Sequence, residues 1–366
     1  MAAGFAALLL TISSAAAAPR SWDYAGGGQW QAVQTPTTAA TQFAPDPGLS
    51  RIEALISHRQ YKPAYKAAVR WLTRSDNRAS PQRDRGLLLA AEALYGYGNR
   101  IRSFYYLDEL LDTYPESPLY YPALEMQYRI AEGYLEGYKR RLLYVPFLGA
   151  YEEGIEMLYR IQNRSPGSPL AEKALLRTAD YYYASAQYDF AADAYGWYVK
   201  QYPRSPMAPR ARLRQAFANL AQFRGLRFDA TPMIDAREQL RAIAAAYPDL
   251  AAEENIAAVL ERIDATFAQK LYATADFYRR TNADRAAVYT YRYLLKAYPD
   301  KPEAQLAQAR LEQMPQWALN EPGPGTVGGE GPATPEEVAT PKVRPAAREA
   351  AVQPSPLSDR PPRTFQ

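Results

Sequence analysis

Residues that could carry out chemistry are few in this chain of 366 amino acids. It contains no cysteine and a single histidine, His58. The lack of cysteine excludes disulfides, a thiolate nucleophile, Cys-ligated zinc and iron–sulfur clusters. One histidine cannot form a two-histidine zinc motif, and no G-x-S-x-G nucleophile elbow accompanies it to suggest a hydrolytic triad. What remains is carboxylate chemistry or no chemistry at all.

The carboxylate pairs of the sequence do not favour catalysis either. Glu152 and Glu153 are adjacent, as are Glu253 and Glu254. On a helix adjacent side chains point about 100° apart, so neither pair can act together on a glycosidic bond. We therefore expect no catalytic residue, no metal site and no cofactor, and a carboxylate hydrolase is the least favoured alternative. The net charge of +4 is too small to indicate nucleic-acid binding.

The elements that could position a binding site lie between two atypical ends. Residues 1–18 carry no charged side chain and consist of an apolar run followed by small residues. This pattern is typical of a secretory signal peptide, with cleavage after Ala17, although no basic residue precedes Arg20. The alternative is the Ala-rich start of a cytoplasmic helix. The apolar run is shorter than the roughly 20 residues that span a membrane.

Two further segments lack the apolar residues that a packed core needs. Residues 19–48 are rich in Gly, Thr, Gln and Pro, and we expect a disordered spacer there. Residues 315–366 are expected to form a disordered tail, because residues 321–366 contain ten prolines and almost no large apolar side chain. The alternative role of the tail is a Pro-rich ligand for a partner.

The central part, residues 49–314, has apolar residues at helical spacing and no strand-like alternation. A pattern ending in proline recurs five times, with 51, 37, 45 and 51 residues between successive prolines. A small residue lies twelve positions before each proline, and a large one lies four positions after the small one. The prolines are Pro115, Pro166, Pro203, Pro248 and Pro299; the small residues are Ser103, Gly154, Ala191, Ala236 and Ala287; the large residues are Leu107, Leu158, Tyr195, Leu240 and Tyr291.

This pattern is that of the second helix of a tetratricopeptide (TPR) repeat. The small residue allows two helices to approach closely, the large residue fills the adjacent groove, and proline ends the helix. Tyr182, Tyr188 and Tyr278 also occupy TPR positions. We predict an all-α, TPR-type helical-hairpin solenoid with about six hairpins and a C-terminal capping helix. The expected hairpins are 49–73, 81–114, 117–164, 168–202, 205–247 and 250–298, and the capping helix is 302–314.

Two segments carry a resemblance to a known family. They are YDFAADAYGWYVKQYPRSP at residues 188–206 and ADFYRRTNADRAAVYTYRYLLKAYP at residues 275–299. Together with an inserted hairpin around residues 223–235, they resemble BamD, a component of outer-membrane β-barrel assembly, and its relatives. The resemblance covers roughly residues 165–314. The single motifs are common among TPR proteins, and their order is more specific to this family than any one motif.

The resemblance implies a non-enzymatic, exported scaffold at the inner face of the outer membrane. Its implied partners are the periplasmic domain of the β-barrel assembly protein and unfolded outer-membrane proteins. Members of the family resemble lipoproteins anchored through a cysteine, and this sequence has none. We therefore expect membrane association through partners rather than a lipid anchor. The alternative function is a periplasmic TPR adaptor for cell-wall or division machinery.

Candidate partner-binding residues come from the aromatic and basic residues of the repeats. Tyrosine gives a large contact area and a hydrogen-bonding tip, and the open face of a solenoid can present it. For Tyr182, Tyr195 and Tyr291 packing between helices is the favoured role, whereas for Tyr121, Tyr181 and Tyr183 packing and partner binding are equally expected. Arg279, Arg280 and Arg292 could face an acidic partner, and the alternative is a solvated surface.

Overall fold

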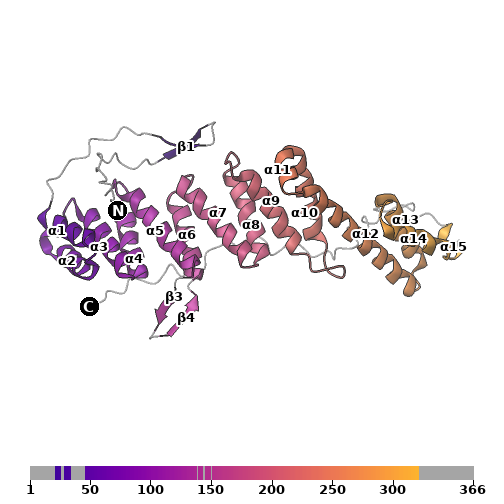
Figure 1. Ribbon diagram of the computed structural model, residues 1–366, viewed down its shortest axis with the longest axis horizontal. Helices are drawn as coiled ribbons and strands as arrows, with labels where there is room; N and C mark the ends of the chain where they lie inside the picture. Colours follow the sequence, from indigo (N-terminus) through magenta and orange to yellow (C-terminus); the bar gives the residue numbers. More distant parts are fainter. Residues whose placement is uncertain are drawn as a thin grey trace, which may run out of the picture. The chain divides into compact units, whose positions relative to one another are not determined.

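The computed structural model describes residues 21–25, 29–33, 46–137, 139–142, 145–149 and 151–320 (Figure 1). The predicted signal peptide lies outside these residues. The chain divides into two compact units, Met1–Asn219 and Leu220–Gln366, and each consists mainly of helical hairpins.

The first unit contains helices that pack in chain order, each against the next from α1 to α8 (Figure 1). A short 3-10 helix, Ser75–Asn77, follows α2. The helices are α1 (Pro47–Ser57), α2 (Tyr61–Thr73), α3 (Arg83–Tyr97), α4 (Arg100–Thr113), α5 (Tyr120–Leu135), α6 (Tyr151–Arg164), α7 (Pro169–Ala184), α8 (Tyr188–Gln201) and α9 (Ala208–Ala221), the last of which ends just inside the second unit.

The second unit is arranged around one long helix. Helix α12 contacts α10, α11, α13 and α14, and α15 packs on α13. The bounds are α10 (Thr231–Ala246), α11 (Pro248–Glu253), α12 (Ile256–Arg280), α13 (Asp284–Ala297), α14 (Pro302–Glu312) and α15 (Gln316–Leu319). The segment before α10 is tied to α12 by Lys270, whose Nζ donates to the carbonyl oxygens of Leu226 at 2.7 Å and Phe228 at 2.8 Å. Burial lowers the pKa of Lys270, and the two carbonyls satisfy its ammonium group.

The all-α prediction is confirmed. Helices pack in pairs within five of the six predicted hairpins, whereas the predicted hairpin 205–247 is divided between the two units. Two short antiparallel hairpins were not predicted: β1 (Ser21–Ala25) with β2 (Gln29–Val33), and β3 (Lys139–Leu142) with β4 (Val145–Gly149). The second lies in the long connection between α5 and α6, where a chain that folds back can satisfy its backbone hydrogen-bonding groups by pairing with itself. The first lies within the predicted spacer.

The predicted ends of the repeat region also differ slightly from the structure. Helix α1 begins at Pro47, with the Asp46 carboxylate accepting from the backbone N–H of Gly48 and Leu49. Helix α15 lies inside the segment expected to be a tail. The remaining residues of the predicted spacer and tail lie outside the described part of the chain.

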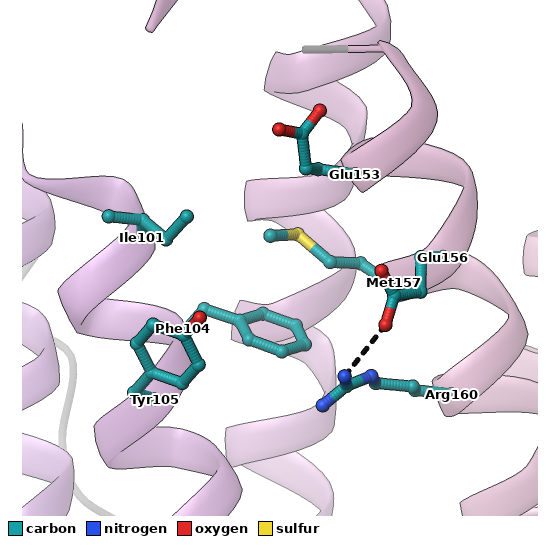
Figure 2. Close-up of a pocket in the computed structure, with 7 residues that line it drawn as sticks. All are labelled: Ile101, Phe104, Tyr105, Glu153, Glu156, Met157 and Arg160. Atoms are coloured by element: carbon teal, nitrogen blue, oxygen red, sulfur yellow. Dashed lines mark hydrogen bonds and ion pairs between the residues drawn. The ribbon is translucent and has the colours of Figure 1, made fainter. Parts of the chain in front are cut away.

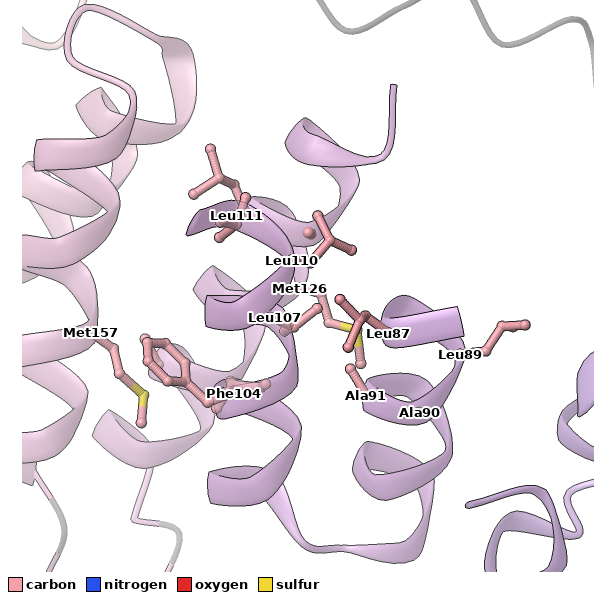
Figure 3. Close-up of a cluster of buried hydrophobic side chains, with 14 of the residues drawn as sticks. Leu87, Leu89, Ala90, Ala91, Phe104, Leu107, Leu110, Leu111, Met126 and Met157 are labelled. Atoms are coloured by element: carbon pink, nitrogen blue, oxygen red, sulfur yellow. The ribbon is translucent and has the colours of Figure 1, made fainter. Parts of the chain in front are cut away.

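The core of the first unit lies between successive helices rather than at one centre. Figure 3 shows how α3 and α4 meet the following helices through leucines, alanines, Phe104 and two methionines. Leu87, Leu107 and Leu110 are fully buried there. Burying one such side chain contributes about 1.5–3 kcal/mol relative to leaving it exposed. A second cluster joins α7, α8 and α9 through Leu175, Ala191 and other residues, including Tyr195 and Tyr198.

Candidate functional site

The five repeated prolines each lie two residues after the end of a helix: α4, α6, α8, α10 and α13. The residue before each proline still donates its N–H to the carbonyl four residues earlier, as Tyr202 does to Tyr198 at 2.8 Å. Proline has no N–H to continue this series, so the helix stops. Pro248 has a second role, because it also occupies the first turn of α11.

The predicted small and large residues of the repeats are all buried in the structure. Ser103 is fully buried in α4, and its hydroxyl donates to the carbonyl oxygen of Ala91 in α3 at 2.7 Å. A Cβ atom on Gly154 would lie 3.0 Å from Tyr134 Cβ and 3.2 Å from the carbonyl oxygen of Ala131, so α6 approaches α5 closely at this point. Leu107, Leu158, Tyr195, Leu240 and Tyr291 are each 0% exposed.

Tyr181 belongs to a run of aromatic rings that crosses three helices. Its ring stacks on Tyr151 at 5.8 Å between centroids and lies 6.0 Å from Tyr182, whose ring lies 5.3 Å from Phe190. Tyr151 is 39% exposed and Phe190 is 43% exposed. We call Tyr151, Tyr181, Tyr182 and Phe190 the aromatic ladder. It presents apolar ring surface to solvent from α6, α7 and α8, as a protein-binding surface requires.

The other predicted tyrosines are used differently. Tyr183 is outside the aromatic ladder and packs edge-on against Tyr188 at 5.6 Å and Tyr195 at 6.4 Å. Tyr121 is half-buried against the core of the first unit, and burial raises its pKa to about 12. Tyr278 is half-buried in α12 beside the exposed ring of Phe277. Of the three candidate tyrosines, the structure thus brings only Tyr181 into an exposed aromatic surface.

The predicted arginines already have contacts within the second unit. Arg279 Nη2 lies 2.8 Å and Arg280 Nε 3.1 Å from the carboxylate of Asp276. The hydrogen bond from Arg279 lowers the pKa of Asp276. Arg292 donates to the carbonyl oxygen of Leu319 at 2.8 Å, which ties α15 to α13. Arg279 and Arg280 thus pair with a residue of their own helix, α12, and Arg292 joins α13 to α15. Binding of an acidic partner by the three arginines stays a prediction.

A small cleft lies between α4 and α6 (Figure 2). Ile101, Phe104 and Met157 form its apolar part, and the Arg160–Glu156 ion pair closes one side at 2.7 Å.

Within the described residues no group of three or more His, Cys, Asp or Glu side chains is placed to hold a metal ion. None of the described helices is both long and apolar enough to cross a membrane.

One charged surface, on α1 and α2, was not predicted from the sequence. A groove along α1 and α2 is lined by five cationic side chains: Arg51, Lys62, Lys66, Arg70 and Arg74. The last four recur at intervals of four residues, which is the spacing of one face of a helix. That spacing was present in the sequence and could have indicated the surface.

Comparison with known proteins gives a family for the second half of the repeats. Residues 148–318, a little under half of the chain, match the family YfiO, described as outer membrane lipoprotein. No curated protein sequence matches the chain. A similar solved structure is the C-terminal part of a TPR repeat-containing protein from Cytophaga hutchinsonii, with 14% identity, 73% of this chain and 88% of that chain covered, and a TM-score of 0.34.

The matched residues begin just before α6 and end within α15. They therefore include the aromatic ladder and the contacts of Arg279 and Arg280 with Asp276. They also contain both segments on which the resemblance to BamD was based. Together, the array of helical hairpins and this match show a BamD-like TPR protein, related over residues 148–318 to the outer membrane lipoproteins of the YfiO family.

Proposed function

We propose that this chain is a non-enzymatic scaffold in the periplasm, at the inner face of the outer membrane, that assists the assembly of β-barrel proteins. The observation that supports it most is the family match over residues 148–318, which coincides with consecutive helical hairpins. Helical repeats of this kind stack into extended surfaces that bind other proteins.

The aromatic ladder is the surface we assign to partner contact within the matched region. Its four rings come from three successive helices, and the centroids of consecutive rings lie 5.3–6.0 Å apart. Rigid aromatic rings bind apolar segments at low entropic cost. Strands of outer-membrane barrels alternate apolar and polar residues, so an unfolded client offers apolar side chains at regular intervals. The periplasmic domain of the barrel-assembly protein is the second partner that we propose.

The test is co-purification of the tagged full-length chain from detergent-solubilised envelopes. We expect recovery of a β-barrel protein that carries periplasmic repeats. We also expect recovery to fall in a Tyr181→Ala/Phe190→Ala variant and not in Trp197→Ala, which removes an exposed ring of α8 outside the ladder. Recovery of septal or cell-wall enzymes alone would contradict the proposal and support an adaptor for that machinery.

Export is tested separately by cell fractionation. We expect the processed chain in the envelope fraction. An unprocessed chain in the cytoplasm would contradict export, and the assembly function with it.

A further inference from the structure

The groove along α1 and α2 combines an apolar floor with a basic rim. Its lining also includes the half-buried side chains of Leu55 and Ala67. Arg51 projects from α1, whereas Lys62, Lys66 and Arg70 project from α2 and Arg74 follows its end. We call these five residues the basic rim. All five side chains are exposed.

The positive charge of the basic rim is not neutralised by the described part of the chain. None of its five side chains forms an ion pair there. The three acidic residues nearby in the sequence make other contacts, and Asp76 accepts from the hydroxyl of Ser75 at 2.9 Å. Asp46 accepts from two backbone N–H groups and from Trp71 Nε1 at 3.1 Å, and Glu53 pairs with Arg85 of α3.

This arrangement costs stability in the unbound chain. Like charges one helical turn apart repel each other and destabilise the helix. Lys62, Lys66 and Arg70 form two such pairs on α2, and Arg74 extends the row by another turn. An anionic ligand would convert this repulsion into attraction.

The spacing of the row indicates the shape of the ligand. Four helical residues rise about 6 Å, so the cations recur at about that interval. In an extended polypeptide, alternate side chains on one face recur at about 6.6 Å. An extended chain with acidic residues at alternate positions therefore presents one carboxylate to each cation along the groove.

Two other anionic partners fit these observations less well. Nucleic-acid strands bind with bases stacked on exposed aromatic rings, and the aromatic residue that lines the groove, Trp71, is 6% exposed. Membrane-surface helices insert large apolar side chains, and no large apolar residue of α1 or α2 is exposed. We propose that this groove binds an extended polypeptide segment with acidic residues at alternate positions. The groove lies outside residues 148–318, so this inference is independent of the proposed assembly function.

The test uses the purified full-length chain and a fluorescein-labelled peptide of alternating glutamate and serine, with one glutamate for each of the four cations of the row, from Lys62 to Arg74. Binding is followed by fluorescence anisotropy at low ionic strength, where exposed charges are least screened. The Lys66→Glu/Arg70→Glu variant should bind at least about tenfold more weakly, because two attractions become repulsions. The matched control is Lys173→Glu/Arg204→Glu, which makes the same change in net charge at exposed cations outside the groove, and it should bind like the original chain.

A second variant, Lys66→Gln/Arg70→Gln, guards against misfolding, and circular dichroism checks that each variant remains helical. A peptide with the same glutamates in one consecutive run should bind several-fold more weakly, because its carboxylates cannot all face the row. Three results would overturn the inference: no peptide binding, equal loss in the control variant, or tighter binding of a single-stranded oligonucleotide or of phosphatidylglycerol vesicles than of the alternating peptide.

Discussion

Two neighbouring hairpins of the first unit have the same repeat pattern but use different polar contacts. Around α5 and α6 the contacts are charged: Asp108 of α4 accepts from Gln127 Nε2 at 2.8 Å, Arg160 Nη1 at 2.9 Å and Arg164 Nη1 at 2.5 Å. Around α7 and α8 they are made by tyrosines. Tyr195 donates its hydroxyl to Asp180 at 2.5 Å, and Tyr198 donates to Glu172 at 2.6 Å.

The two hairpins should lose different amounts of stability when one residue of such a polar contact is substituted. Asp108 and Arg164 are 13% and 18% exposed at their side chains, so each depends on the other to offset its lost hydration. Tyr195 is fully buried, but the carboxylate that it contacts is 36% exposed and keeps access to water. The charged hairpin should therefore be the more sensitive of the two to single substitutions.

The largest effect is expected from Asp108→Ala. It leaves the Arg164 guanidinium nearly buried with a weakened set of acceptors, and we expect the free energy of unfolding to fall by about 3 kcal/mol. Chemical denaturation of the full chain measures this. Asp112→Ala is the control, because Asp112 also contacts Arg164 but is 68% exposed, and it should change stability by less than about 0.5 kcal/mol. Equal effects of the two substitutions would show that the burial of Asp108 is unimportant.

A second substitution compares glycines in the two hairpins. In Gly154→Val the added atoms meet Tyr134 Cβ and the backbone oxygen of Ala131, which cannot move without shifting α5. We expect a loss of about 2 kcal/mol from overpacking. Gly196→Val in α8 is the matched change, because a Cβ there meets the end of the flexible Gln215 side chain. The loss there should be clearly smaller, and thermal melts of both variants decide between them.

The fold was largely predictable because its determinants are local in the sequence. Each of the five prolines follows the end of a helix by two residues, and the small residue twelve positions before each proline is buried. These local positions therefore predict the second helix of each hairpin. The charged contacts were not predictable, since Asp108 and Arg164 are 56 residues apart and nothing local pairs them. Tyr181 and Tyr183 were equivalent in the sequence, and only the packing of α6 and α8 places one ring in the exposed ladder and the other against Tyr195.

Alkaline pH should weaken both hairpins, because both contain partly buried tyrosines with raised pKa values. Burial raises the pKa of Tyr182 and Tyr195 in the folded chain, and that of Tyr202 to about 12, from the ordinary value of 10.0. A raised pKa means that the folded state holds these protons more tightly, so their contribution to stability is present below pH about 10 and is lost between about 10 and 12. Burial also raises the pKa of Tyr121 to about 12 and raises that of Tyr128 and Tyr159 in α5 and α6. Hydrogen exchange resolved by segment should therefore show α5–α6 and α7–α8 losing protection over the same range of pH. Earlier loss in α7–α8 would show that its tyrosine contacts are the more sensitive to deprotonation.

The smallest effect is expected from Tyr195→Phe, which keeps the ring and removes one hydroxyl. The hydroxyl donates to Asp180, which also accepts from Arg214 Nη1 at 3.2 Å. Because Asp180 keeps this arginine and access to water, we expect a loss of about 1 kcal/mol at neutral pH, measured by denaturation. The variant should also lose less stability than the original chain between pH about 10 and 12, because one raised tyrosine pKa no longer contributes. A loss as large as that of Asp108→Ala would mean that the Tyr195 hydroxyl contributes as much to stability as the carboxylate of Asp108, which would contradict the comparison.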